Sequence, residues 1–202
     1  MSKPLPRHIG FIPDGNRRWA ETHGLAREEG YQHGMAPGVA LFELCQGLGI
    51  EEVSVYGFTQ DNTRRPTAQT ERFRAACTGF AEAIAPHCAL LVLGDETSAQ
   101  FPSALLPFRQ RHGSGMRVNF LVNYGWDWDL AGLRQGELRS QEVSRLDLIV
   151  RWGGARRLSG FLPVQSVYAD FHVIDDFWPD FTPAHLHEAL AWFRRQDPTL
   201  GG

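Results

Sequence analysis

The residues with the clearest chemical potential lie near the start of the chain, directly after a short apolar run. The segment from Asp14 to Trp19 holds one carboxylate, one glycine and two adjacent arginines. A glycine at the start of a helix lets backbone N–H groups approach an anion, and arginine offers paired donors that match phosphate oxygens. Asp14 would repel a phosphate unless a divalent cation lay between them, so it is a candidate Mg²⁺ ligand. Considered alone, these residues fit an Asp-Gly turn with solvated arginines equally well.

A second basic cluster lies late in the chain, again directly after an apolar run. Arg151 precedes the pair Gly153 and Gly154, and Arg157 and Ser159 follow it. A Gly-Gly turn would bring the two arginines and the hydroxyl to one anion, and these groups are common phosphate donors. The sequence therefore suggests two separate phosphate sites. A solvated, arginine-rich loop is the alternative interpretation.

Two further polar segments follow apolar runs, one from Thr59 to Pro66 and one from Asn123 to Asp129. The first contains an amide, a carboxylate and two arginines. In an open α/β sheet, the segments that follow the carboxyl ends of parallel strands form the ligand site. We therefore expect all four polar segments to face one edge of a sheet.

The elements that must position these segments are predicted from the apolar pattern. Short apolar runs rich in β-branched residues are typical of buried strands, and they occur at 8–12, 53–58, 90–93, 118–124, 146–150 and 171–174. Amphipathic stretches at 39–48, 71–85 and 184–193 have the length of crossover helices. Residues 131–145 lack a clear period and form a short helix or an exposed loop. The alternation predicts an α/β fold with a central, mainly parallel six-stranded sheet flanked by helices.

Composition limits the classes of protein that this chain can belong to. Its 202 residues suit a single domain over residues 1–202, with 43% hydrophobic and 21% charged residues, as in ordinary soluble proteins. A net charge of -3 argues against broad electrostatic binding to nucleic acid. Three widely spaced cysteines favour buried free thiols in a reducing compartment over a zinc site. With no apolar signal segment and no run long enough to span a membrane, we expect a cytoplasmic protein.

Taken together, five segments resemble the cis-prenyltransferase family, typified by undecaprenyl diphosphate synthase. They occur in the order Asp14 to Ala20, Asn62 to Pro66, Arg151 to Ser159, Gln165 to Ala169 and Phe177 to Phe181. The resemblance extends from His8 to Gly202, and the order of five segments makes it far more specific than any one of them. It implies a butterfly-like α/β fold, a homodimer, and adjacent sites for an allylic diphosphate and isopentenyl diphosphate.

The resemblance also implies roles for individual residues. Asp14 would bind Mg²⁺, and Asp170 stands where the family has a glutamate that helps to hold the metal from the partner subunit. Asn62, at a position implicated in deprotonation, and Arg65 would take part in catalysis. The allylic diphosphate would be bound by Gly15, Asn16, Arg17, Arg18, Trp19, Arg27, Tyr31 and Thr59. The acceptor would be bound by Arg151, Trp152, Arg157 and Ser159.

Departures from the family pattern cluster around the acceptor. Trp152 replaces a threonine, Trp126 replaces a small residue near the substrate, and Tyr31 replaces a histidine near the allylic diphosphate. The chain is also shorter than long-chain members after the Asn62 to Pro66 segment and before the fifth strand. A short helix that carries Phe73 and Phe80 suggests a shallow hydrophobic tunnel.

These features favour a Mg²⁺-dependent prenyltransferase that joins a short allylic group, from dimethylallyl or geranyl diphosphate, to a second prenyl diphosphate. The product would be a short-chain or irregular isoprenoid diphosphate. One alternative is prenylation of an aromatic acceptor in natural-product biosynthesis, with Trp126 and Trp152 stacking on the ring or stabilising an allylic cation. Simple packing explains the two tryptophans at least as well. The other alternative is a non-catalytic partner subunit, which the intact Asp14 to Trp19 segment disfavours.

Overall fold

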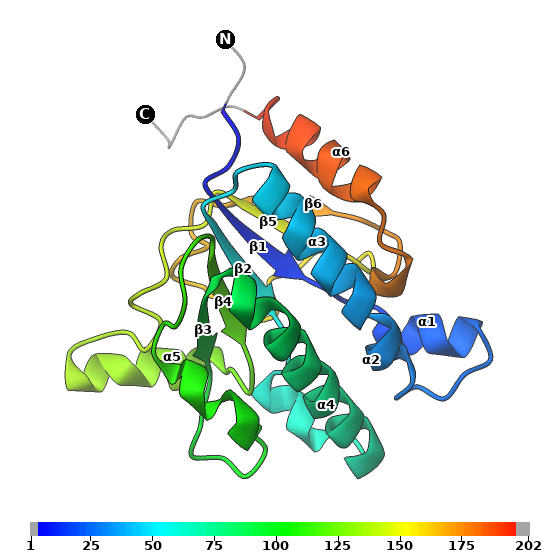
Figure 1. The fold of residues 1–202 in the computed structure, drawn as a ribbon, viewed down its shortest axis with the longest axis vertical. Coiled ribbons are helices and arrows are strands. Elements are labelled where there is room, and N and C mark those ends of the chain that lie inside the picture. Colours follow the sequence, from blue (N-terminus) through cyan, green and yellow to red (C-terminus); the bar gives the residue numbers. More distant parts are fainter. Residues whose placement is uncertain (1–3, 197–202) are drawn as a thin grey trace.

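A computed structural model describes residues 4–196 of the chain; residues 197–202, to which the family resemblance extends, lie outside the described part. Six strands form one sheet in the order β3-β4-β2-β1-β5-β6, and each strand runs parallel to its neighbours (Figure 1). The strands are β1 (His8–Ile12), β2 (Glu52–Tyr56), β3 (Ala89–Leu93), β4 (Arg117–Leu121), β5 (Leu148–Arg151) and β6 (Asp170–Val173). The predicted parallel sheet is confirmed, with strand ends shifted by a few residues.

The strand order places β1 between β2 and β5, two strands whose carboxyl ends also lead into polar segments. After β1 the chain forms β2 on one side of it, and only later returns to add β5 on the other side. At such a switch point the connections leave in opposite directions, which opens a crevice beyond the carboxyl ends of the strands. The segments after β1, β2 and β5 are the ones whose side chains suggested phosphate binding.

Helices cover one face of the sheet, and the other face is covered largely by irregular chain. Apolar residues of α3 (Met35–Gly47), α4 (Thr67–Ile84) and α6 (Pro183–Phe193) pack on the first face. On the second face Val143, Leu146, Phe161 and Leu162 pack against the sheet. The three predicted helices are confirmed, and α4 begins four residues earlier than the predicted 71–85.

Short helices that the periodicity does not predict complete the fold. They are α1 (Asn16–Thr22), α2 (Gly30–His33), α5 (Trp126–Ala131) and the 3₁₀ helices η1 (Gln60–Arg64), η2 (Ala85–His87), η3 (Ser103–Arg109), η4 (Gly132–Gln135) and η5 (Trp178–Asp180). Only η4 falls within the ambiguous stretch 131–145. Elements of four to seven residues bury too few side chains to show a period in the sequence. No helix in residues 4–196 has the length and apolarity needed to span a membrane.

Gly10 in β1 makes the closest contact between the sheet and its irregular cover. A Cβ atom at this position would lie 2.5 Å from a ring carbon of Phe161 and 3.1 Å from a methyl group of Leu146. We expect Gly10→Ala to lower the free energy of unfolding by about 1–3 kcal/mol, because the ring must move within a close-packed core. Urea denaturation measures this change.

Gly47→Ala is the matched control. Gly47 lies in α3 and an added Cβ there would have no neighbour within 4 Å. The stability of this variant should be unchanged or slightly higher, because alanine favours the helix. Equal losses in the two variants would contradict the packing argument.

A buried polar cluster lies at the opposite, amino end of the sheet. The His8 ring is 2% exposed, with Nδ1 placed 3.0 Å from the carbonyl oxygen of Ser144 and Nε2 placed 2.9 Å from Oγ of Ser54. These partners suit a neutral ring, in which Nδ1 donates and Nε2 accepts. Burial lowers the pKa of His8 below its ordinary value of 6.5.

The lowered pKa of His8 predicts acid sensitivity. As the pH falls below 6.5, the unfolded chain takes up a proton that the folded protein resists, so stability decreases until the lower folded pKa is reached. His8→Gln should unfold more easily at neutral pH but lose less additional stability between pH values above and below that range. Urea denaturation at the two pH values, with the exposed His87→Gln as control, tests this prediction. An unchanged pH dependence in His8→Gln would contradict it.

Candidate active site

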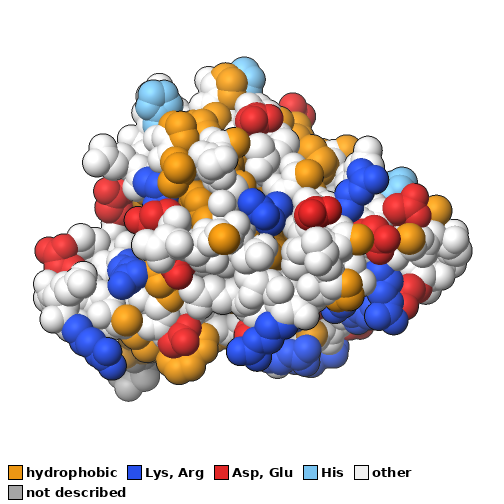
Figure 2. Space-filling view, turned by 90° about the horizontal axis from the view of Figure 1, so that it is seen from below, with side chains coloured by type: hydrophobic (Ala, Val, Ile, Leu, Met, Phe, Trp, Pro, Cys, Tyr) orange, Lys and Arg blue, Asp and Glu red, His pale blue; other side chains and the backbone are white. Residues whose placement is uncertain are grey.

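A cavity of about 470 Å³ lies beyond the carboxyl ends of β1, β2 and β5. Its described lining includes six arginines, Arg17, Arg18, Arg27, Arg65, Arg151 and Arg157, and three carboxylates, Asp14, Glu21 and Asp61. The lining therefore carries an excess of three positive charges, in a protein whose net charge is -3. Figure 2 shows basic side chains grouped along the lower middle and the right of the face seen from below. This charge attracts a polyanion to the cavity.

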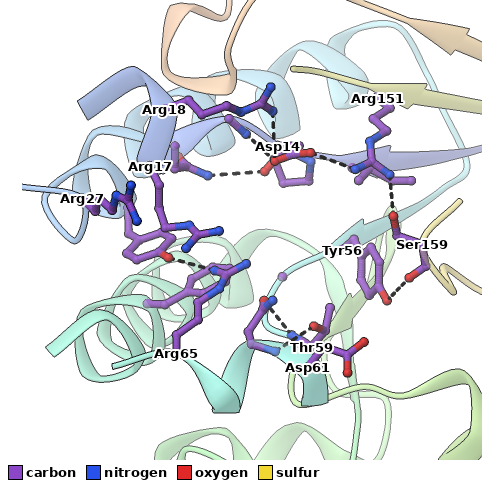
Figure 3. Close-up of a pocket in the computed structure, with 18 of the residues that line it drawn as sticks. Asp14, Arg17, Arg18, Arg27, Tyr56, Thr59, Asp61, Arg65, Arg151 and Ser159 are labelled. Carbon is purple, nitrogen blue, oxygen red and sulfur yellow. Dashed lines mark hydrogen bonds and ion pairs between the residues drawn. The ribbon is translucent and has the colours of Figure 1, made fainter. Parts of the chain in front are cut away.

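Asp14 lies between two basic clusters and connects them (Figure 3). The first cluster consists of Arg17 and Arg18, and the second consists of Arg151, Arg157 and Ser159. Its Oδ2 accepts a hydrogen bond from Nη2 of Arg151 at 2.8 Å. Its Oδ1 accepts from the backbone N–H of Gly15 at 2.6 Å and lies 3.5 Å from Nη2 of Arg18. The side chain remains 35% exposed, so the carboxylate keeps a face toward the cavity.

Arg151 is the most buried arginine of the site, with a side chain that is 4% exposed. One Nη donates to Asp14, and the other donates to Oγ of Ser159 at 2.9 Å and to the carbonyl oxygen of Arg157. Its Nε has no partner. The turn at Gly153 and Gly154, with φ of 80° and 73°, folds the segment back so that these contacts form. The Gly-Gly turn thus brings the second basic cluster together as predicted.

Gly15 holds the first basic cluster in place. It precedes α1 with a φ of 106°, and an added Cβ would lie 2.7 Å from the Phe177 ring. Both the left-handed backbone and the close ring therefore require glycine. The same ring lies 5.0 Å from the guanidinium carbon of Arg18, which donates to the carbonyl oxygen of Gly153 at 3.0 Å. The segment around Phe177 thus supports the arginine that faces the cavity.

Tyr31 and Arg65 form the next part of the wall. Nη1 of Arg65 donates to the Tyr31 hydroxyl oxygen at 2.8 Å, and the Tyr31 ring stacks on Phe73 at 4.4 Å. Burial lowers the pKa of Arg65, and nearby Arg17 lowers it further, although Tyr31 and Asp14 oppose this change. A bound anion would offset both effects on Arg65, because it favours the charged form of the guanidinium.

Thr59 and Asn62 form a capping box at the start of η1. The Thr59 hydroxyl accepts from the Asn62 backbone N–H at 3.3 Å, and Oδ1 of Asn62 accepts from the Thr59 backbone N–H at 3.2 Å. This arrangement uses the carbonyl oxygen of the Asn62 side chain and leaves its amide N–H₂ group for the cavity, which both residues line.

An apolar pocket of about 70 Å³ adjoins the charged cavity. Tyr31, Tyr56 and Phe73 line both, so the two spaces meet at these rings. The pocket continues between the sheet and helices α3 and α4, where Met35, Ala76, Cys77, Phe80 and Phe120 line it. The Phe80 and Phe120 rings pack edge to face at 5.1 Å, which limits its depth.

Most of the predicted site residues meet in the charged cavity. These are Asp14, Gly15, Asn16, Arg17, Arg18, Arg27, Tyr31, Thr59, Asn62, Arg65, Arg151, Arg157 and Ser159. Three predicted residues do not line it: Trp19, Trp152 and Asp170. The residues of this cavity lie up to 145 positions apart in the sequence, and the parallel sheet brings them together.

The structure corrects the interpretation of Trp152. Its side chain is 0% exposed and packs against Phe11, Trp178 and Phe181 in the core, while Nε1 donates to His185 at 3.2 Å. It therefore cannot contact an acceptor in this conformation, and its prediction as an acceptor-binding residue is wrong. Side chains alternate between faces along a strand, and Trp152 continues the alternation from Arg151 to the helix-covered face.

Trp19 also points away from the cavity. Its Nε1 donates to Asp180 at 2.7 Å, and its ring stacks on His23 at 4.1 Å. Its prediction as a direct ligand of the allylic diphosphate is therefore corrected: Trp19 joins α1 to η5.

Asp170 lies at the amino end of β6, in register with Leu148 at the start of β5. Asp14 follows the carboxyl end of β1, so within one chain the two carboxylates lie at opposite ends of the sheet. A role for Asp170 in metal binding therefore requires a partner subunit.

Several residues in or beside the cavity have no role predicted from the sequence, among them Tyr56, Glu21 and Phe177. Tyr56 donates from its hydroxyl to the carbonyl oxygen of Ser159 at 2.9 Å, Glu21 pairs with Arg27 at 2.5 Å, and Phe177 supports Gly15 and Arg18. The carboxyl-end position of Tyr56 in β2 is a signal that could have identified it. Phe177 depends on a contact between distant segments, and Glu21 on the turn that brings Arg27 back to it.

The donor set of the cavity fits Mg²⁺ held jointly with a diphosphate. Mg²⁺ in phosphate-transfer sites uses one or two carboxylates and takes its other ligands from phosphate oxygens and water. Asp14 supplies one such partly exposed carboxylate among arginines. Within residues 4–196 no group of three or more acidic, histidine or cysteine side chains could hold a metal without such help.

Comparisons with known proteins agree with this geometry. The family model described as putative undecaprenyl diphosphate synthase matches residues 12–136 and 131–201. An isoprenyl transferase of Streptococcus thermophilus is 29% identical over 235 residues, which cover 98% of this chain and 94% of the relative. A farnesyl-diphosphate-specific undecaprenyl diphosphate synthase of Vibrio cholerae is 30% identical over 228 residues, which cover 98% and 91%.

A solved structure has the same fold. Lavandulyl diphosphate synthase from Lavandula x intermedia, in complex with dimethylallyl diphosphate, superposes with a TM-score of 0.82 and 22% identity, covering 98% of this chain and 99% of its own. The chain, an enzyme that transfers prenyl groups, belongs to the cis-prenyltransferase family.

Proposed function

We propose that this protein transfers a short allylic group, dimethylallyl or geranyl, from its diphosphate to a second prenyl diphosphate, and that the reaction depends on Mg²⁺. The observation that carries the proposal is the junction of two unlike spaces. A strongly basic cavity opens at Tyr31 and Phe73 into a small apolar pocket. A diphosphate bearing a short hydrocarbon tail matches both spaces at once.

The size of the apolar pocket favours a short tail. Its volume of about 70 Å³ is less than half that of an engineered cavity of about 150 Å³ that binds benzene, so it can hold only part of a hydrocarbon tail. The five-carbon dimethylallyl group, with the end of its chain still in the charged cavity, is therefore favoured over geranyl, which would require Phe80 to move. The similar solved structure, which contains dimethylallyl diphosphate, is consistent with this choice.

The second diphosphate would be bound on the other side of Asp14. Arg157 and Ser159 are exposed to the cavity, and the unpartnered Nε of Arg151 adds positive charge behind them. Because Asp14 lies between the two basic clusters, its carboxylate would hold Mg²⁺ within the cavity, where the ion would neutralise phosphate charge. The product is then a short-chain or irregular isoprenoid diphosphate.

The residues of the cavity account for the first chemical step. When bound, Mg²⁺ neutralises charge on the departing diphosphate. Arg17, Arg18 and Arg65 stabilise the same charge from fixed positions, which lowers the barrier to breaking the allylic C–O bond. After the acceptor double bond has attacked the allylic carbon, the product loses a proton to an oxygen of the departing diphosphate, near Asn62.

The proposal includes a homodimer, because Asp170 can reach a metal at Asp14 only across a subunit interface. It also places the protein in the cytoplasm. The tail pocket and the basic cavity do not require the dimer for their shape, because both are lined by residues of one chain.

Asp14→Asn tests the proposed role of the carboxylate. The amide keeps the shape but removes the charge that would hold Mg²⁺, so kcat with dimethylallyl and isopentenyl diphosphates should fall by a factor of about 100 or more. Mass spectrometry of the products and release of diphosphate measure the rate. The control is Asp175→Asn, an exposed carboxylate on the same edge, which should retain full activity. Undiminished activity of Asp14→Asn would show that the metal assignment is wrong.

Phe80→Leu tests the limit on tail length. Removing part of the ring should deepen the pocket and raise kcat/KM for geranyl relative to dimethylallyl diphosphate by about tenfold. Phe193→Leu is the matched control, because Phe193 is also buried but does not line the pocket. If both variants leave the ratio unchanged, Phe80 does not set the tail length.

A further inference from the structure

A second space, the side chamber, opens from the charged cavity on its Ser159 side. It has a volume of about 370 Å³. Tyr56, Thr59, Asp61 and Ser159 line both spaces, so the side chamber is continuous with the cavity where a second substrate would react. In Figure 3, Asp61 lies on this side, away from Arg17 and Arg27. The roles assigned so far make no use of this chamber.

The side chamber differs in charge from the cavity that it joins. Its lining contains two carboxylates, Asp61 and Asp127, and one cation, Arg64. Arg64 pairs with Asp61 at 3.7 Å while both side chains are more than 80% exposed, so the pair is weak. Asp127 accepts a hydrogen bond from the backbone N–H of Trp128 at 2.9 Å, and its negative charge remains to attract a cation. A diphosphate is therefore drawn to the arginines of the main cavity and not to this chamber.

The chamber also presents a buried hydrogen-bond acceptor. Asn123 lines it, is 1% exposed and has the left-handed φ of 54°. Its Nδ2 donates to the carbonyl oxygen of Asp95, whereas Oδ1 has no partner. A buried acceptor without a donor is costly, and backbone strain of this kind often occurs at ligand sites. The carboxylates of the chamber favour a ligand that brings hydrogen-bond donors.

One wall of the chamber is an exposed aromatic ring. The Trp126 side chain is 53% exposed and is held against Gly160, where a Cβ would lie 2.8 Å from the indole. The φ of 78° at Gly160 supports the same backbone approach. An exposed indole next to carboxylates favours a flat ring and a nearby ammonium group.

We propose that the side chamber binds a second class of acceptor, a phosphate-free aromatic ring that carries an ammonium group and a hydroxyl. This inference rests on the proposed transfer of the allylic group. The ring stacks on Trp126, the ammonium pairs with Asp127, and the hydroxyl faces the main cavity.

The corresponding reaction balances without a further reagent. The phenolic oxygen forms a bond to the allylic carbon while the bond from that carbon to the diphosphate oxygen breaks. The electron pair of the broken bond leaves with the diphosphate, and the phenolic proton passes to the Asp61 carboxylate, which lines both spaces. The products are an aryl prenyl ether and diphosphate.

Binding of tyramine tests the site directly, because tyramine combines the ring, the ammonium and the hydroxyl. Calorimetry is carried out on the full chain in the presence of Mg²⁺ and inorganic diphosphate, which occupy the main cavity. We expect saturable binding that weakens about tenfold in Asp127→Asn and in Trp126→Ala, both exposed positions. Asp175→Asn, a carboxylate outside both spaces, should bind as the unaltered chain does. Absence of binding, or equal weakening in all three variants, would overturn the proposal.

Product analysis separates this inference from the proposed function. The unaltered chain is incubated with dimethylallyl diphosphate and either tyramine or isopentenyl diphosphate. Prenylated tyramine, reduced in Asp127→Asn and retained in Asp175→Asn, supports the side chamber. Products from isopentenyl diphosphate without any from tyramine would refute the chamber as an acceptor site and leave the proposed function standing. No consumption of dimethylallyl diphosphate with either acceptor would refute both.

Discussion

The contact between Asp14 and Arg151 is the interaction on which the site depends. It joins the segment that follows β1 to the last residue of β5, and these neighbouring strands are separated by more than a hundred residues. Arg151 is almost fully buried, so its charge would be costly without this partner. The pair fixes Arg157 and Ser159 through Arg151, and Gly15 and Arg18 through Asp14. One partly buried ion pair thus sets the distance between the two basic clusters.

A cavity with six arginines is expensive to maintain in the absence of an anion. Like charges at close range repel, and burial lowers the pKa of Arg65. The fold limits this cost by giving several guanidinium groups a carbonyl, carboxylate or aromatic neighbour. The remaining positive charge is available to an anion. Binding of an anion would reduce the repulsion between the arginines.

The two faces of the sheet contribute different environments to the same edge. On the helix-covered face, α3 and α4 enclose the apolar pocket beside Phe80. The side chamber instead lies among the segments after β2 and β4, with Trp126 at the start of α5. Hydrocarbon and polar groups can therefore enter the reaction site from separate directions, with Asp14 and its arginines between them. Specificity for each substrate then depends on a different set of residues.

The sequence by itself determined the six strands, the three longest helices and most of the residues that line the charged cavity. These features are local. A buried strand is recognised from a continuous apolar run, and a glycine turn is recognised from a few adjacent residues. Only the tertiary structure decided where Trp19 and Trp152 point, how deep the tail pocket is, and that Asp14 pairs with Arg151. Each of these depends on which distant segments pack together. The sequence around a side chain does not specify which residues of other strands will contact it.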